Sequence, residues 1–132
     1  GAPVRYHAYR SPEEQIAIIE EIVRKLLRKG LAAERIRIIS SHKRSKSCLA
    51  GAERVAGIPV IEYSPPGKSG TIGFSSLHRA KGLESDAVIF CDVDGGEPYC
   101  SKQNQYVAVS RARLILHVVH RADWKPPENA AL

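Results

Sequence analysis

The spacing of apolar and polar side chains changes along the chain and predicts strands and helices in turn. Residues 4–10 (VRYHAYR) alternate with a period of two, as in a half-buried strand. From residue 12 to Gly30 the large aliphatic side chains recur at helical spacing instead. The sequence SPEE at residues 11–14 is typical of a helix N-terminus, with a capping box and a proline at the first helical position. The chain is therefore predicted to begin with a strand and an amphipathic helix.

Further short apolar runs, each bounded by polar or turn-forming residues, predict the other strands. These runs cover residues 36–40, 58–63, 71–75, 87–91 and 114–119, with helices predicted around 49–55 and over 102–111 and a loop at 64–70. Strands that alternate with helices predict a mostly parallel sheet in a three-layer α/β domain. Residues 121–132 are expected to form a loose tail.

The size of the chain restricts it to one domain. With 132 residues and 43% hydrophobic content it can build one core, so residues 1–132 are predicted to fold as a unit. The sequence has no apolar run of membrane-spanning length and no secretory signal pattern, so we expect no membrane partner and a cytoplasmic location. The chain lacks methionine and opens with Gly1-Ala2-Pro3, which favours part of a longer gene product.

Cysteine spacing and net charge exclude few classes of function. Cys48, Cys91 and Cys100 are odd in number and have no C-x-x-C spacing, which argues against a disulfide framework and a zinc ribbon. We expect reduced thiols. A net charge of +6 and a pI near 9.4 favour a polyanionic partner such as nucleic acid. An ordinary solvated basic surface explains the same balance equally well.

Two segments stand out as candidate ligand loops, and both are expected at the carboxyl ends of strands, where α/β sheets bind ligands. Residues 75–84 (SSLHRAKGLE) combine hydroxyls, an imidazole and two cations with Gly82, which lets backbone amides approach a phosphate. Glu84 could accept a hydrogen bond from a sugar hydroxyl. A polar turn in which glycine merely permits a positive φ is an equally good interpretation.

The second candidate segment is residues 104–113 (NQYVAVSRAR), predicted to be largely helical. Arg111 would project from the end of that helix, where a guanidinium is suited to a γ-phosphate. A solvated arginine that interacts with the helix dipole is the commoner case at such a position. Local chemistry alone therefore leaves the role of Arg111 open.

The two segments together resemble a known family. The sequence SSLHRAKGLESDAVIF at residues 75–90, followed by NQYVAVSRARLILHVV at 104–119, is similar to motif V followed by motif VI of UvrD/Rep-type superfamily 1 DNA helicases. The opening strand, the helix with an acidic start and the run ERIRIIS resemble the start of the second RecA-like domain in that family. The resemblance extends from about Arg5 to His120. It implies motif IV near residues 36–47, motif V at 75–91 and motif VI at 104–113.

This resemblance implies a role for each matching position. Arg111 matches the arginine finger that stabilises charge on the transferred γ-phosphoryl group. Gly82 and Glu84 match positions that face the nucleotide, whereas Ser76 and His78 match positions that face single-stranded DNA. ATP with Mg²⁺ would bind between this domain and a first RecA-like domain, which supplies the P-loop lysine and the metal ligands. The 132 residues alone are then expected neither to hydrolyse ATP nor to unwind duplex DNA.

The chain departs from the family pattern at motif IV. Many relatives carry a tyrosine and an arginine where this sequence has the run from Ser40 to Arg44, so an adenine-stacking tyrosine is absent. The second γ-phosphate arginine is replaced by Lys43, by Arg44 or by nothing. The large insertion that UvrD carries between motifs IV and V is also absent, so the domain resembles a compact variant.

Several other features are expected to be uninformative. The sequence GKS at residues 67–69 lacks the glycine that a P-loop needs five positions earlier. Asp92-Val93-Asp94 is the closest approach to a magnesium-binding strand end and is not convincing. His117 and His120 are three residues apart on a predicted strand, so they should face opposite sides and not share a metal.

Two alternative functions remain at the level of sequence. The first is a non-catalytic RecA-like module that binds nucleic acid or serves as a scaffold in a repair or nuclease assembly. The intact AKGLE and SRA sequences argue against such degeneration. The second is an independent phosphate-handling enzyme, for which we find no cluster of nucleophile and base.

Overall fold

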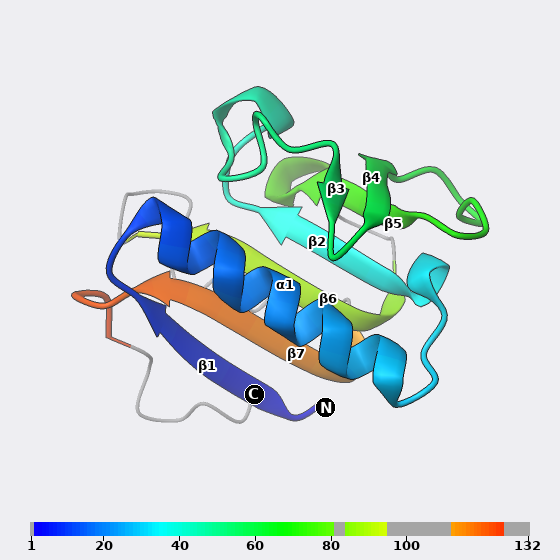
Figure 1. The fold of residues 1–132 in the computed structure, drawn as a ribbon, viewed down its shortest axis with the longest axis horizontal. Helices are drawn as coiled ribbons and strands as arrows, with labels where there is room; N and C mark the ends of the chain where they lie inside the picture. Colours follow the sequence, from blue (N-terminus) through cyan, green and yellow to red (C-terminus); the bar gives the residue numbers. More distant parts are fainter. Residues whose placement is uncertain (1, 81–83, 95–111, 126–132) are drawn as a thin grey trace.

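The computed structural model describes residues 2–80, 84–94 and 112–125. Within these residues the chain forms seven strands, one α-helix and three short 3-10 turns (Figure 1). In chain order these are β1 Val4–Tyr9, α1 Pro12–Arg28, η1 Ala33–Arg35, β2 Ile36–Ser40, η2 Arg44–Lys46, β3 Arg54–Val55, β4 Ile58–Glu62, β5 Ile72–Ser76, η3 Leu77–Arg79, β6 Ser85–Val93 and β7 Ala112–Arg121. No helix in this described part is long and apolar enough to cross a membrane.

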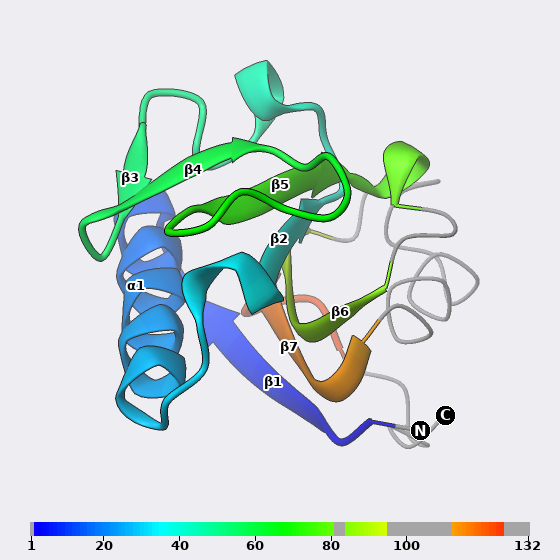
Figure 2. The same cartoon turned by 90° about the vertical axis from the view of Figure 1, so that its right-hand side faces the viewer.

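The strands form one sheet in the order β1-β7-β6-β2-β5-β4-β3. All neighbouring strands are parallel except β3 and β4, which form an antiparallel hairpin at one edge. The sheet curls around α1, which lies along its concave face (Figure 2). The prediction of an α/β domain with a mostly parallel sheet is confirmed. The helix predicted over 102–111, which would cover the other face, lies outside the described residues.

Local sequence explains where α1 begins and ends. The Ser11 hydroxyl accepts a hydrogen bond from the backbone N–H of Glu14, and Pro12 occupies the first turn, where its missing N–H costs nothing. The helix stops before Gly30, which adopts a φ of +94° that a side chain would disfavour. The face toward the sheet buries Ile19 and Val23 completely.

Both faces of the sheet carry apolar clusters. The cluster under α1 includes Ile38 and Ile89 from the central strands. The cluster on the opposite face includes Ile39, Phe90 and Leu116, all fully buried. Because β2 and β6 are covered on both sides, they read as continuous apolar runs, as central parallel strands commonly do.

The predicted helix around residues 49–55 is wrong. Residues 48–51 form turns, and Arg54–Val55 is the first strand of the β3–β4 hairpin. The turn between the strands is Ala56-Gly57, with φ angles of +51° and +79°, which matches the twist of a two-residue hairpin. The Arg44 guanidinium also binds the carbonyl oxygens of Leu49 and Ala52, and the Leu49 carbonyl accepts the Ala52 N–H in a turn and not in an α-helix.

The start of the expected tail, residues 121–125, belongs to the described part of the chain. Strand β7 extends to Arg121, and the Trp124 ring packs 5.0 Å from the His120 ring, centroid to centroid. Only residues 126–132 of the expected tail lie outside the described part. His117 packs toward α1, whereas His120 lies with Tyr6 on the other face, which confirms that the two imidazoles point apart.

Candidate nucleotide and nucleic-acid edge

Three strands end side by side at the end of the sheet where the parallel strands finish, which we call its carboxyl edge. Ser40 at the end of β2 pairs with Ser76 at the end of β5 and with Cys91 near the end of β6. Because the three strands are parallel, the segments that follow them leave from the same edge. The structure therefore brings the motif IV segment after Ser40 next to the start of motif V at Ser76.

Asp92 holds this edge together. Its buried carboxylate accepts a short hydrogen bond from the Ser40 hydroxyl and bonds of 3.1 and 3.2 Å from the Cys48 backbone N–H. It also accepts from the Gln15 side chain of α1, at 3.3 Å. The carbonyl of Asp92 accepts from the Ser41 hydroxyl at 2.7 Å. One residue of β6 thus fixes the segment from Ser40 to Cys48 and the first turn of α1.

Asp92 occupies a special backbone position. It adopts a φ of +61°, in the left-handed region, where the pairing of β6 with β7 is irregular. Such a conformation is costly for a residue with a side chain and persists where surrounding bonds fix it. Sequence reasoning considered this residue only as a weak candidate for magnesium. Its bonding partners lie 44 to 77 residues away, so no local pattern could reveal this role.

Two thiols lie beside the same carboxylate. The sulfur atoms of Cys48 and Cys91 and an Asp92 carboxylate oxygen are within 4.8 Å of one another. A hydrogen bond to Cys48 and complete burial raise the pKa of Cys91, so its thiol stays protonated near neutral pH. The carboxylate is occupied by the hydrogen bonds just described. Both cysteines are free, which confirms the expected reduced thiols for this pair, whereas Cys100 lies outside the described residues.

The two cations of motif IV have different environments. The Arg44 guanidinium donates to the carbonyls of Leu49, Ala52 and Val60 at 3.3, 2.6 and 3.1 Å, and it lies over the Phe74 ring. Lys43 is exposed at the start of η2. Of the two candidates for the missing motif IV arginine, Arg44 is therefore used to fold the segment. Lys43 is the one that can reach a ligand.

A shallow depression of about 370 Å³ opens at this edge. It is lined by Lys43, Arg44, Ser45, Glu62, Phe74, Ser76 and Arg79. Arg79 forms an ion pair with Glu62 at 3.8 Å, but both side chains are more than half exposed, so the pair is weak and can open. His78 is exposed in the same turn, η3. Cations, a hydroxyl and an imidazole suit the phosphate groups of a nucleotide or a nucleic-acid strand.

Glu84 lies at the opposite end of the sheet from Ser76, where the parallel strands begin. It directly precedes β6, whose first residue Ser85 pairs with Ala112 at the start of β7. Its carboxylate contacts Arg113 at 3.1 Å and lines a different depression from Ser76. The expectation that residues 75–84 gather at the carboxyl edge is thus wrong for Glu84. Because β5 and β6 run in the same direction, the connection must cross from one edge to the other.

Two of the expected site residues cannot be placed. Gly82 and Arg111 lie outside the described residues. Arg111 directly precedes Ala112 at the start of β7, whereas Gly82 lies two residues from both Ala80, after β5, and Glu84, before β6. The structure therefore brings Ser76 and His78 together at one edge, and Glu84 beside the start of β7 at the other.

Sequence reasoning missed a buried arginine beneath Glu84. Arg37 is completely buried in β2, donates to the carbonyl oxygen of Glu84 at 3.0 Å and lies 3.8 Å from the centre of the Tyr63 ring. A Cβ at Gly73 would come within 2.5 Å of the Tyr63 ring, so glycine is required there. The available signal was a charged residue in the middle of the apolar run IRIIS. A buried charge in such a run requires a dedicated partner.

The fold resembles that of a helicase C-terminal domain. It is similar to the solved C-terminal domain of a possible DNA helicase from Lactobacillus plantarum WCFS1, with a TM-score of 0.68 and 18% identity over 95% of this chain and 76% of that one. Residues 72–119, from the start of β5 into β7, match the family model of the UvrD-like helicase C-terminal domain. This match confirms the resemblance seen in the sequence. Comparison with curated proteins gives no significant match.

Proposed function

We propose that the chain is the second motor domain of an ATP-dependent DNA helicase. The observation that carries this proposal is the pairing of Ser85 with Ala112. Ser85 directly follows the AKGLE sequence, and Ala112 directly follows the arginine of SRA. The described last residues of the two motifs, Glu84 and Ala112, therefore lie at adjacent strand starts, which supports a shared nucleotide-facing role.

In this proposal the chain supplies half of an ATPase site. Arg111 stabilises the charge that develops on the γ-phosphoryl group, and Gly82 and Glu84 contact the nucleotide. The P-loop lysine and the ligands of Mg²⁺ come from a first RecA-like domain. Glu84 becomes available when its exposed ion pair with Arg113 opens, which costs little because both side chains are more than half exposed.

Ser76 and His78 are proposed to contact the phosphates of single-stranded DNA. Ser76 ends β5 and lines the same depression as Lys43 and Arg79, and His78 is exposed in the turn that follows. A row of cations and hydrogen-bond donors along one edge suits a strand backbone and is insensitive to base sequence. Closing and opening of the nucleotide cleft would then move this edge relative to the first domain and advance the strand. A cytoplasmic location remains a prediction.

The test uses the full-length protein with its first RecA-like domain. Arg111→Ala is expected to lower kcat for DNA-stimulated ATP hydrolysis by roughly a thousandfold or more, with little change in KM. Arg54→Ala is the matched control, because Arg54 is exposed on the β3–β4 hairpin and only bonds the Gly57 carbonyl. The 132-residue chain alone should show no turnover. Comparable rates for Arg111→Ala and the parent, or turnover by the isolated chain, would sink the assignment.

The non-catalytic alternative makes a different prediction in the same experiment. A module that only binds nucleic acid would keep its affinity for single-stranded DNA and show no nucleotide-dependent change in it. The motor predicts that ATP changes DNA affinity in the parent protein but not in Arg111→Ala. Measuring DNA affinity with and without ATP therefore separates the two functions.

A further inference from the structure

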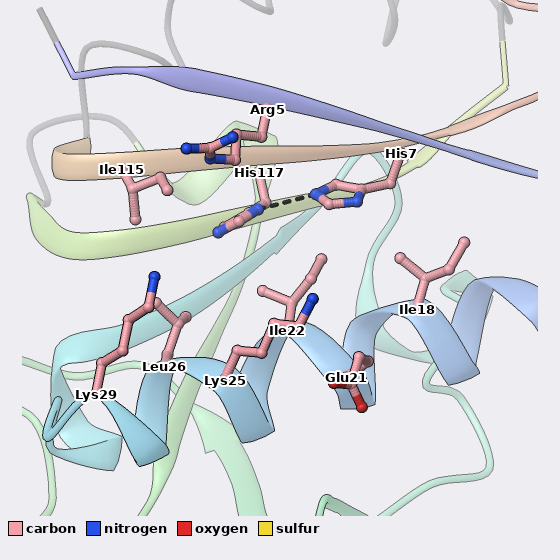
Figure 3. Close-up of a pocket in the computed structure, with 10 residues that line it drawn as sticks. All are labelled: Arg5, His7, Ile18, Glu21, Ile22, Lys25, Leu26, Lys29, Ile115 and His117. Carbon is pink, nitrogen blue, oxygen red and sulfur yellow. Dashed lines mark hydrogen bonds between the residues drawn. The ribbon is translucent and has the colours of Figure 1, made fainter.

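A cavity of about 420 Å³ opens between α1 and the strands β1 and β7 (Figure 3). It is lined by Arg5, His7, Ile18, Glu21, Ile22, Lys25, Leu26, Lys29, Ile115 and His117. Its α1 residues start at Ile18, beyond the first turn of the helix, where Gln15 bonds Asp92. The cavity shares no lining residue with the depression at the carboxyl edge. It is therefore separate from the proposed motor site.

Three cations from two elements surround this cavity. Arg5 extends from β1, Lys25 extends from the last turn of α1, and Lys29 is the residue that caps the end of α1 (Figure 3). None of the three forms an ion pair with a described carboxylate. The one acidic lining residue, Glu21, directs its carboxylate to Arg24 at 3.8 Å and Arg28 at 3.4 Å. The cavity is therefore strongly positive.

Two imidazoles form the wall between the cations. The Nε2 atom of His7 and the Nδ1 atom of His117 are 2.9 Å apart, so one ring donates a hydrogen bond to the other (Figure 3). The pKa of His117 is lowered to about 4, mainly by burial and further by repulsion from His7, Arg5, Lys29 and Lys25. Two neutral rings therefore line a positive cavity near neutral pH. Repulsion from the nearby cations is a smaller cause of the lowered pKa than burial, and an anion placed there would offset that repulsion.

The remaining lining is apolar. Ile22, Leu26 and Ile115 lie on the floor and sides, and the volume is within the range of small-molecule sites. Apolar walls with convergent polar groups favour a ligand that has both an apolar body and a charged end. Three cations match a doubly charged phosphate better than a single carboxylate.

We infer that this cavity is a second ligand site, which binds a small organic phosphate through Arg5, Lys25 and Lys29 and holds its apolar body against Ile22 and Ile115. The site does not depend on the proposed motor function, because no residue of motifs IV, V or VI that we assigned a role contributes to it.

Phenyl phosphate is a suitable probe because it has no base or ribose that a nucleotide cleft would recognise. Titration into the 132-residue chain is followed by the imidazole proton resonances of His7 and His117. We expect both to shift, with a dissociation constant on the order of 1 mM or tighter. We also expect the pKa of His117 to rise toward its ordinary value, because the bound dianion favours the protonated ring.

Variants and controls make the inference refutable. Lys25→Gln with Lys29→Gln should weaken phenyl phosphate binding by roughly tenfold or more, and Lys46→Gln with Lys68→Gln should not, although both pairs remove the same charge. Lys46 and Lys68 are exposed and lie outside the cavity. Unchanged histidine resonances, or equal weakening by both pairs, would overturn the site. Equal binding of neutral benzyl alcohol, or tighter binding of a short oligonucleotide at the same resonances, would overturn the ligand class.

Discussion

Lys43 and Arg44 are neighbouring residues of the same charge that have different roles. Arg44 satisfies three backbone carbonyls of the irregular segment after η2, whereas Lys43 is exposed at the rim of the depression. Hydrogen bonds from a charged donor each contribute about 1.5–3 kcal/mol, and their loss removes a charged partner from each of the three carbonyls. The sequence could not separate the two cations, because both follow the strand in the same polar stretch.

This difference predicts opposite effects of two alanine substitutions. Arg44→Ala should lower the free energy of unfolding by about 2–4 kcal/mol, because several carbonyls lose their partner. Lys43→Ala should change it by less than about 0.5 kcal/mol, as for other exposed residues, yet lower DNA-stimulated ATP hydrolysis in the full-length protein. Urea unfolding measures the free energy of unfolding of both variants, and an ATPase assay measures hydrolysis by the Lys43→Ala protein. Equal loss of stability in both variants would show that Lys43 is also structural.

Arg37 and Asp92 are the residues that sequence reasoning could least foresee. Each is buried, charged and bonded to groups far away in the chain: Arg37 to the carbonyl of Glu84, and Asp92 to Gln15, Ser40 and Cys48. A lone sequence shows which residues are charged, but not which segments the fold brings together. The positions of Ser76 and His78 followed from the resemblance, whereas these buried contacts required coordinates.

At the scale of elements, the spacing of apolar residues predicted the long helix and the buried strands well. Helix α1 and strands β2, β4, β5, β6 and β7 lie within about two residues of their predicted bounds, since each has a clear period or a continuous apolar run. The β3–β4 hairpin was missed. Strand β3 has only two residues, and the turn has Ala56 where Asn or Asp is the usual signal.

The hairpin turn allows a direct test of this correction. Ala56 has a φ of +51°, so Ala56→Asn should raise the free energy of unfolding by roughly 0.5–1 kcal/mol, because asparagine tolerates this region better than alanine. Urea unfolding of the parent and of Ala56→Asn measures whether the free energy of unfolding rises or falls. A loss of stability would contradict the hairpin.

At the scale of the whole molecule, the His7–His117 pair links stability to pH. The pKa of His117 falls from an ordinary 6.5 to about 4 in the folded chain. Between these values the unfolded chain binds a proton that the folded chain does not, so the free energy of unfolding should fall as pH drops through that window. Above about pH 6.5 His117 is neutral in both the folded and the unfolded chain, so this loss of stability is absent.

Urea unfolding at pH 7 and pH 5 measures this effect. His117→Phe removes the titrating group and keeps an aromatic ring in its place, so it should lose less stability between the two pH values than the parent. His42→Phe is the control, because His42 lies at the other edge of the sheet, after β2. An identical pH dependence in the parent and His117→Phe would show that carboxylates alone cause it.

The bonds of Asp92 also determine how this domain can move. Its carboxylate ties the beginning of α1, the end of β2 and the backbone of Cys48 to a single strand. None of these segments can be displaced without breaking bonds to the others. Any rearrangement on ligand binding should therefore carry helix, loop and sheet along as one stiff piece.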